Sequence, residues 1–177
     1  IHQTNMMLNL INKCKIKCNS NEIIDIDFPK EKLIFSKSKS MVIHLTDRWI
    51  NSFYSENDFI ELITLLLNKN YLILMTTDTT TRNKFTKIFN KYKLINESNV
   101  KNIQMMDESA IIIDNINYEL WLKVIYSASQ VITPECGCVH IAAACKIPVN
   151  IIYNNVEHNA INKEYAPWKS KYNKYIF

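Results

Sequence analysis

The fold is decided by residues 131–144, which read Val131-Ile132-Thr133-Pro134-Glu135-Cys136-Gly137-Cys138-Val139-His140-Ile141-Ala142-Ala143-Ala144. Gly137 is the only glycine in this chain of 177 residues. A chain of this length and average composition would contain about 12 glycines, at roughly 7% usage. Glycine adopts positive φ freely and lets a ligand lie directly against the backbone. We therefore expect Gly137 to occupy a place that does not tolerate a Cβ atom.

The local pattern around Gly137 predicts a strand, a tight turn and a helix. Residues 131–133 are typical of the end of a short buried strand, and Pro134 marks the exit because it cannot donate to a β-ladder. Residues 138–145 predict a helix with a small alanine face. The free N–H groups and positive dipole end of such a helix suit a phosphate group. An ordinary βα turn that holds a structural glycine is the alternative that geometry leaves open.

Strand-like and helix-like segments alternate along the chain, which predicts an α/β fold with a parallel sheet and helices on both faces. We expect a Rossmann-like domain with right-handed crossovers. The predicted strands are 41–45, 71–75, 110–114, 130–133 and 149–153, and the predicted helices are 4–14, 55–68, 82–92, 118–128 and 138–146. Residues 93–109 leave a short strand and an added turn open, and residues 169–177 predict a basic, aromatic tail.

Composition limits the classes of protein to which the chain can belong. The length suits one domain or slightly more, and an apolar content of 47% is enough for a core. The net charge of +4 is spread along the chain, which argues against a nucleic-acid partner. No apolar run approaches the roughly 18 residues of a membrane-spanning helix. Five cysteines without disulfide-like spacing indicate reduced thiols in the cytosol, and we expect no metal site at Cys136, Cys138 and His140.

The central stretch belongs to a longer pattern. It runs through Tyr118-Glu119-Leu120, Ala128, residues 131–137, His140-Ile141-Ala142-Ala143-Ala144 and Ile147-Pro148-Val149. This pattern resembles the C-terminal half of the heptosyltransferase-type enzymes of glycosyltransferase family 9, in which Asp-(Thr/Ser)-Gly, then x-x-His-x-Ala-Ala-Ala and Pro-Val follow one another. The resemblance covers about residues 1–168 and is most specific over 118–149. It implies the C-terminal half of a GT-B glycosyltransferase, with a nucleotide-sugar site.

The resemblance implies that the loop after the strand at 41–45 contacts the nucleotide phosphates. Thr46 matches one hydroxyl position of the family, and Asp47 replaces the next. Asn51 stands where family members have a lysine. Arg48 is the candidate to replace that lysine as the phosphate cation, because a guanidinium group is always charged and fork-shaped. The alternative is that Arg48 pairs with Asp47 or with a surface carboxylate.

Two further positions are implied by the resemblance to lie near the nucleoside. Thr81 falls about where the family has a glutamate that contacts the nucleoside. A threonine-rich turn that caps the helix at 82–92 is the competing interpretation of Thr81. Ile116 falls where the family places a residue against the base.

In the central turn, the resemblance implies a diphosphate and sugar site. The backbone N–H groups of Cys136 and Gly137 would hold the diphosphate, and the helix dipole would stabilise negative charge on the leaving nucleotide. Glu135 matches the family's aspartate and would bind sugar hydroxyls. His140 would donate to a phosphate or brace the turn, and the alternative is a buried, hydrogen-bonded helix residue.

We therefore interpret residues 1–40 as a linker helix and lead-in from a missing N-terminal domain, and residues 41–177 as the nucleotide-sugar-binding domain. The chain opens without an initiator methionine, which predicts a processed, cut or truncated product. The expected activity is sugar transfer from a nucleotide sugar, such as an ADP-sugar, to a lipopolysaccharide-core or other glycan. The family's catalytic base lies in the N-terminal domain, so we expect no catalytic residue, no metal, no cofactor and no transfer in this chain alone.

The expected location is the cytoplasm, with peripheral placement at the inner membrane face as a further expectation. Two other functions stay open. One is a degenerate, non-catalytic GT-B-like domain kept for packing or for partner binding, which the missing lysine, glutamate and glycines favour. The other is a nucleotide-sugar epimerase-like domain, which would need more acidic and histidine chemistry than the sequence shows.

Overall fold

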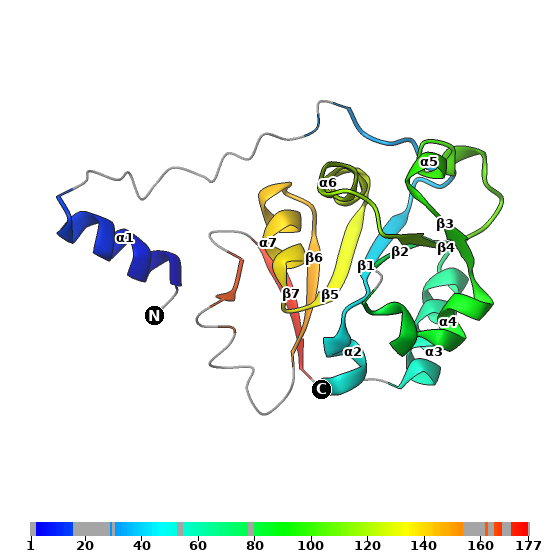
Figure 1. Cartoon of the computed structure of the whole chain (residues 1–177), viewed down its shortest axis with the longest axis horizontal. Helices are drawn as coiled ribbons and strands as arrows, with labels where there is room; N and C mark the ends of the chain where they lie inside the picture. Colours follow the sequence, from blue (N-terminus) through cyan, green and yellow to red (C-terminus); the bar gives the residue numbers. More distant parts are fainter. Residues whose placement is uncertain are drawn as a thin grey trace.

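The computed structural model describes residues 3–15, 29, 31–52, 55–77, 80–153, 162, 165–167 and 171–176. Over these residues, seven strands form one sheet in the order β3-β4-β2-β1-β5-β6-β7, and every pairing is parallel (Figure 1). The strands are β1 Ser40–His44, β2 Leu72–Thr77, β3 Lys93–Ile95, β4 Ala110–Asp114, β5 Gln130–Pro134, β6 Val149–Tyr153 and β7 Tyr172–Ile176. The predicted Rossmann-like α/β fold is therefore confirmed.

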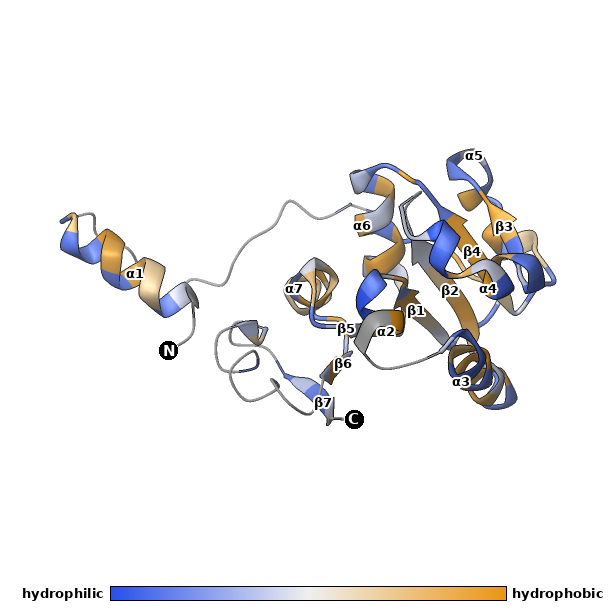
Figure 2. Cartoon of the chain, turned by 60° about the horizontal axis from the view of Figure 1, so that its bottom comes forward, coloured by the Kyte–Doolittle hydropathy of each residue, from blue (hydrophilic) through white to orange (hydrophobic). Residues whose placement is uncertain are grey.

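The central strands are short apolar runs because both of their faces are covered. Every residue of β2, β4 and β6 is buried. Strands of a parallel sheet with helices on both sides are expected to be continuously hydrophobic in this way. Figure 2 shows the same pattern, with hydrophobic strands such as β2 and β4 inside and hydrophilic segments at the helix surfaces.

The helices divide between the two faces of the sheet. On one face, α5, α6 and α7 pack on a core that includes Val42, Leu74 and Val131. On the other, α2, α3 and α4 pack on a core that includes Ile43 and Ile73. The helices are α1 Gln3–Lys13, α2 Asp47–Ser52, α3 Glu56–Asn68, α4 Thr86–Lys91, α5 Glu97–Val100, α6 Tyr118–Ser127 and α7 Gly137–Ala144, with 3-10 turns η1 Arg82–Lys84 and η2 Ile103–Met105.

The start of α3 is fixed by a capping box. The hydroxyl of Ser55 accepts from the backbone N–H of Asp58, and the carboxylate of Asp58 accepts from the backbone N–H of Ser55 at 2.9 Å. Each side chain thus satisfies a backbone donor that the helix leaves open. Ser55, the first residue of the helix predicted over 55–68, is therefore the N-cap of α3.

Two secondary-structure predictions were wrong. The helix predicted over 82–92 forms as η1 followed by α4, with a break at Phe85, whose side chain is fully buried. Residues 172–176 were predicted to lie in a tail, but they form β7 and pair with β6. A cross-strand amide contact supports this pairing, because Asn173 donates to the side chain of Asn150 at 2.9 Å. The ambiguous region 93–109 holds β3, α5 and η2.

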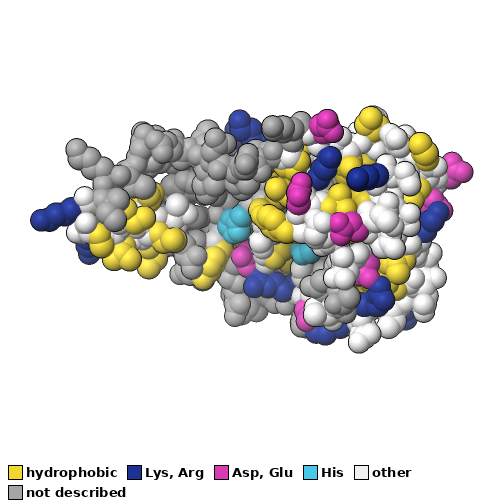
Figure 3. Space-filling view, turned by 45° about the horizontal axis from the view of Figure 1, so that its top comes forward, with side chains coloured by type: hydrophobic (Ala, Val, Ile, Leu, Met, Phe, Trp, Pro, Cys, Tyr) yellow, Lys and Arg dark blue, Asp and Glu magenta, His cyan; other side chains and the backbone are white. Residues whose placement is uncertain are grey.

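The segment before β1 has two described parts. Helix α1 lies to one side of the sheet (Figure 1), and its Met6, Met7 and Leu10 are more than half exposed. Figure 3 shows a group of hydrophobic side chains at the end of the molecule where α1 lies. Nearer β1, Leu33 and Phe35 pack against the core. No helix within the described ranges is long and apolar enough to cross a membrane.

Candidate functional site

The candidate site lies at the carboxyl edge of the sheet. Strand β1 lies between β2 and β5. Strands β2, β3 and β4 lie on one side of β1, and β5, β6 and β7 lie on the other, so the strand order reverses at β1. Ligands of open α/β sheets bind outside the carboxyl ends of the strands at such a reversal of strand order. The turns that follow β1 and β5 therefore form the floor of the expected site.

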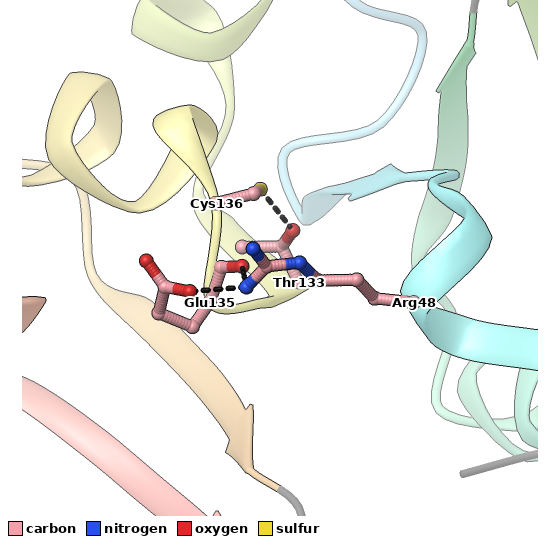
Figure 4. Close-up of polar contacts among 4 residues, drawn as sticks. All are labelled: Arg48, Thr133, Glu135 and Cys136. Carbon is pink, nitrogen blue, oxygen red and sulfur yellow. Dashed lines mark hydrogen bonds and ion pairs between the residues drawn. The ribbon is translucent and has the colours of Figure 1, made fainter. Parts of the chain in front are cut away.

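These two turns are joined by Arg48 and Glu135 (Figure 4). Arg48 is the second residue of α2, and its Nη1 donates to the backbone carbonyl of Glu135 at 2.5 Å and forms an ion pair with the Glu135 carboxylate. The Arg48 side chain is 55% exposed, whereas the Glu135 side chain is 14% exposed. The structure therefore bears out the alternative that Arg48 pairs with a carboxylate, and that carboxylate belongs to Glu135, the residue expected to bind sugar hydroxyls.

A second ion pair lies on the other side of the same turn. Asp47, the first residue of α2, accepts from Nζ of Lys84 at 2.6 Å. Lys84 belongs to η1, which follows β2. Sequence reasoning missed Lys84, because its pairing joins two segments that are 37 positions apart. The structure thus places two cations beside the β1–α2 turn.

Gly137 occupies the first position of α7, and the expectation that it excludes a Cβ atom was wrong. Its φ is not positive, and a Cβ atom built on it would meet no atom within 4 Å. The residue is exposed. The space in front of the backbone at the start of α7 is therefore open, which leaves room for a ligand to approach the helix N–H groups.

Cys136 is the N-cap residue of α7, in extended conformation. Its Sγ lies 3.2 Å from Oγ1 of Thr133, a fully buried residue at the end of β5 (Figure 4). Burial raises the pKa of the Cys136 thiol, although the hydrogen bond to Thr133 and the backbone N–H groups of Cys138 and Val139 act in the opposite direction. The thiol is therefore neutral near pH 7 beside the amino end of α7.

The other predicted site residues differ in how exposed they are to solvent. His140 is exposed on the first turn of α7, so the alternative of a buried residue does not hold. Thr81 is buried, and its hydroxyl pairs with that of Thr77. Ile116 follows β4 and packs partly buried against the core. Asn51 lies in α2, and its side chain lies outside the described residues.

Thr46 ends the loop between β1 and α2. Its hydroxyl is buried and has no hydrogen-bond partner among the residues that the structure describes, and the same holds for Oδ1 of Asp47. Buried polar atoms are ordinarily paired, so such atoms indicate a missing partner such as water or a ligand.

A polar and aromatic group at the same edge was missed by sequence reasoning. His44 ends β1, and its Nδ1 lies 3.0 Å from Oγ1 of Thr76. Trp121 of α6 donates to the same oxygen at 3.3 Å, and its ring lies 5.2 Å from that of His44. Tyr118, also in α6, is 61% exposed, with its ring 5.9 Å from Trp121. The helical spacing of Tyr118 and Trp121 was the only signal in the sequence.

Tyr153 adds a polar group at the end of β6. Its side chain is 1% exposed, and its hydroxyl has no hydrogen-bond partner within the described part of the chain. Burial raises the pKa of this phenol, and the neighbouring Tyr172 and Glu135 add to the shift. The hydroxyl therefore stays neutral near Glu135. Across the described ranges, no three His, Cys, Asp or Glu side chains gather into a group that could hold a metal ion.

The structure is similar to solved glycosyltransferase structures. The glycosyl transferase family 9 protein from Veillonella parvula DSM 2008 matches with a TM-score of 0.74 and 10% identity, over 99% of this chain and 49% of that chain. The fold resembles that of family 9 glycosyltransferases. The E. coli ADP-heptose lps heptosyltransferase II matches with a TM-score of 0.55 and 12% identity, over 77% of this chain and 38% of that one. No protein-family model and no curated protein matches the sequence.

The E. coli heptosyltransferase WaaC, whose structure was solved with ADP, matches with a TM-score of 0.54 and 16% identity, over 84% of this chain and 40% of that one. The family 9 resemblance seen in residues 118–149 therefore agrees with the fold. The chain spans about half, or less, of the length of each of these glycosyltransferases.

Proposed function

We propose that this chain is the donor-binding half of a glycosyltransferase of heptosyltransferase type, and that it binds a nucleotide sugar at the carboxyl edge of its sheet. The Arg48–Glu135 contact carries the proposal, because it brings a cation and a sugar-binding carboxylate together where the strand order reverses. The likeness to glycosyltransferase structures supports it. The open space in front of Gly137 supplies a place for the diphosphate.

Each group has a distinct task in the proposed complex. The N–H groups at the start of α7 and the guanidinium of Arg48 bind the diphosphate and stabilise the charge that develops on the leaving nucleotide. Glu135 accepts hydrogen bonds from sugar hydroxyls. Ile116 lies against the base, and His140 donates to a phosphate from its exposed position. The catalytic base and the binding site for the glycan acceptor, such as a lipopolysaccharide core, would lie in an N-terminal domain. The transfer would take place in the cytoplasm.

Thermal unfolding with nucleotides tests the proposal. The panel contains ADP, UDP, GDP and CDP, their sugar conjugates, and the four nucleosides as phosphate-free controls. Ligand at about 100 times its Kd adds roughly 2.7 kcal/mol of stability. For a domain of this size, that raises the midpoint by about 5–10 °C. A selective rise with one diphosphate supports the proposal and identifies the base, whereas a flat panel at millimolar ligand contradicts it.

A degenerate domain kept for packing or partner binding is the second candidate. The specific observation in its favour is that the hydroxyl of Thr81 is buried and paired with Thr77, where the family has a nucleoside-binding glutamate. This reading predicts the flat panel. It also predicts that substitutions at Arg48 alter stability alone.

A further inference from the structure

We infer that Lys84 and Arg48 form a two-cation clamp for a diphosphate, and that Asp47 and Glu135 occupy the clamp when no ligand is bound. The inference rests on the proposed function and adds Lys84 as a residue that determines phosphate binding. Its starting point is the pairing of two consecutive residues, Asp47 and Arg48, with partners from two different turns.

The two pairs lie on opposite sides of β1. Lys84 comes from the segment after β2, and Glu135 comes from the turn after β5. Strands β2 and β5 both pair with β1, and neighbouring strands lie about 4.8 Å apart. The turns that carry Lys84 and Glu135 therefore follow strands about 10 Å apart, with the β1–α2 turn between them. The two cations therefore contact this turn from its β2 side and from its β5 side, which would give each of two linked phosphate groups a cation.

The clamp is accessible from solvent. The side chain of Lys84 is 42% exposed and that of Asp47 is 47% exposed, and Arg48 is 55% exposed. The Lys84–Asp47 pair is exposed at both ends and such pairs contribute little to stability, so replacing the Asp47 carboxylate by a phosphate should change the free energy of unfolding little. Arg48 uses only Nη1 for its two contacts with Glu135. A guanidinium has five N–H donors, so donors on its other nitrogens stay available for an anion.

The unpaired oxygens of the turn also point to a ligand. The hydroxyl of Thr46 and Oδ1 of Asp47 are buried without a hydrogen-bond partner among the described residues. The Thr46 hydroxyl can donate to a phosphate oxygen, whereas an ionised Asp47 can only accept. A bound diphosphate would thus supply the acceptor that Thr46 lacks. Lys84 would then donate to the phosphate instead of to Asp47.

Three variants of the 177-residue chain test this inference. Lys84→Met removes the charge and keeps the aliphatic stem, and Asp47→Asn removes the competing anion and keeps the shape. Lys87→Met is the matched control, because Lys87 lies three residues further on and donates instead to Asn57 at 2.9 Å. Calorimetric titration measures the Kd of the nucleoside diphosphate that the parent chain binds most tightly, of its monophosphate, and of inorganic pyrophosphate.

We expect Lys84→Met to weaken the diphosphate and pyrophosphate about tenfold and the monophosphate less than threefold, as loss of one charge-assisted contact predicts. Asp47→Asn should tighten the diphosphate, and Lys87→Met should change nothing. If Lys84→Met binds as the parent does, or if Lys84→Met and Asp47→Asn weaken binding equally, Lys84 only braces the turn and the inference is wrong. If the parent chain binds no nucleotide, the proposed function fails and the clamp fails with it.

Discussion

Arg48 and Glu135 form an ion pair across the carboxyl ends of β1 and β5, and the carboxylate is the more buried partner. We expect Arg48→Met to lower the free energy of unfolding by about 1 kcal/mol, because Glu135 then keeps its charge without a partner. The double variant Arg48→Met/Glu135→Gln should regain most of this loss. Urea unfolding measures both. Lys93→Met, which breaks the exposed pair with Glu108, is the control and should cost less; equal costs would contradict the prediction.

Gly137→Ala should separate binding from folding. The added Cβ atom meets open space and φ is not positive, so the variant should be as stable as the parent, or more stable by about 0.5 kcal/mol because alanine favours the helix. The same methyl group would lie where we place the diphosphate, so nucleotide affinity should fall about tenfold. Thermal midpoints with and without ligand measure both effects. If the variant is stable and binds nucleotide with unchanged affinity, the diphosphate does not lie at the start of α7.

Asn150 should be required to hold β7 on the sheet. It is 7% exposed, accepts from Asn173 and Tyr175, and donates to Gln130 and to the backbone carbonyl of Val131, so Asn150→Ala removes a hydrogen bond from four groups. We expect a loss of about 1–3 kcal/mol in unfolding free energy. Hydrogen exchange should accelerate across 172–176 before the central strands. Asn99→Ala, at an exposed helix position, is the control. Unchanged protection of 172–176 would contradict the role of Asn150.

The capping box should make the stability that α3 contributes depend on pH. Hydrogen bonds from the side chain and backbone of Ser55 lower the pKa of Asp58. A folded-state pKa below the unfolded value means that the contribution is complete above the unfolded pKa and is lost as the pH falls through the folded pKa. Asp58→Asn should therefore show a smaller fall of the thermal midpoint between pH 6 and pH 3 than the parent. Glu61→Gln, on the exposed side of the same helix, is the control, and a parallel fall in all three proteins would refute the prediction.

Cys136 should react slowly with an alkylating reagent. Burial raises its pKa, so little thiolate is present near pH 7.5, and the rate should rise only as the pH passes the ordinary thiol range. The exposed Cys14 provides the internal reference in the same mass-spectrometric experiment. A bound diphosphate at α7 should slow Cys136 further and leave Cys14 unaffected. Faster alkylation of Cys136 than of Cys14 would show that its thiol is not shielded.

The sequence was sufficient for β1, β2, β4, β5 and β6, because buried parallel strands are continuous apolar runs, and for the strand–turn–helix order at β5 and α7. It was not sufficient for β7, whose Tyr172 and Lys174 belong to an edge strand with polar and aromatic side chains. Nor did it predict the partners of the charged residues. Arg48 and Lys84 pair with residues 87 and 37 positions away, and such contacts follow from strand order, which local patterns do not determine.

The open space beside Gly137, at the start of α7, has a consequence for how far the sequence of such a site can vary. In the proposed site, the anion-binding groups at the start of α7 are main-chain N–H groups, which every residue except proline possesses. Most side chains around this turn can therefore differ between proteins while the proposed anion-binding groups stay the same. A search for proteins with such a site is better based on the three-dimensional arrangement of strand, turn and helix than on a sequence motif.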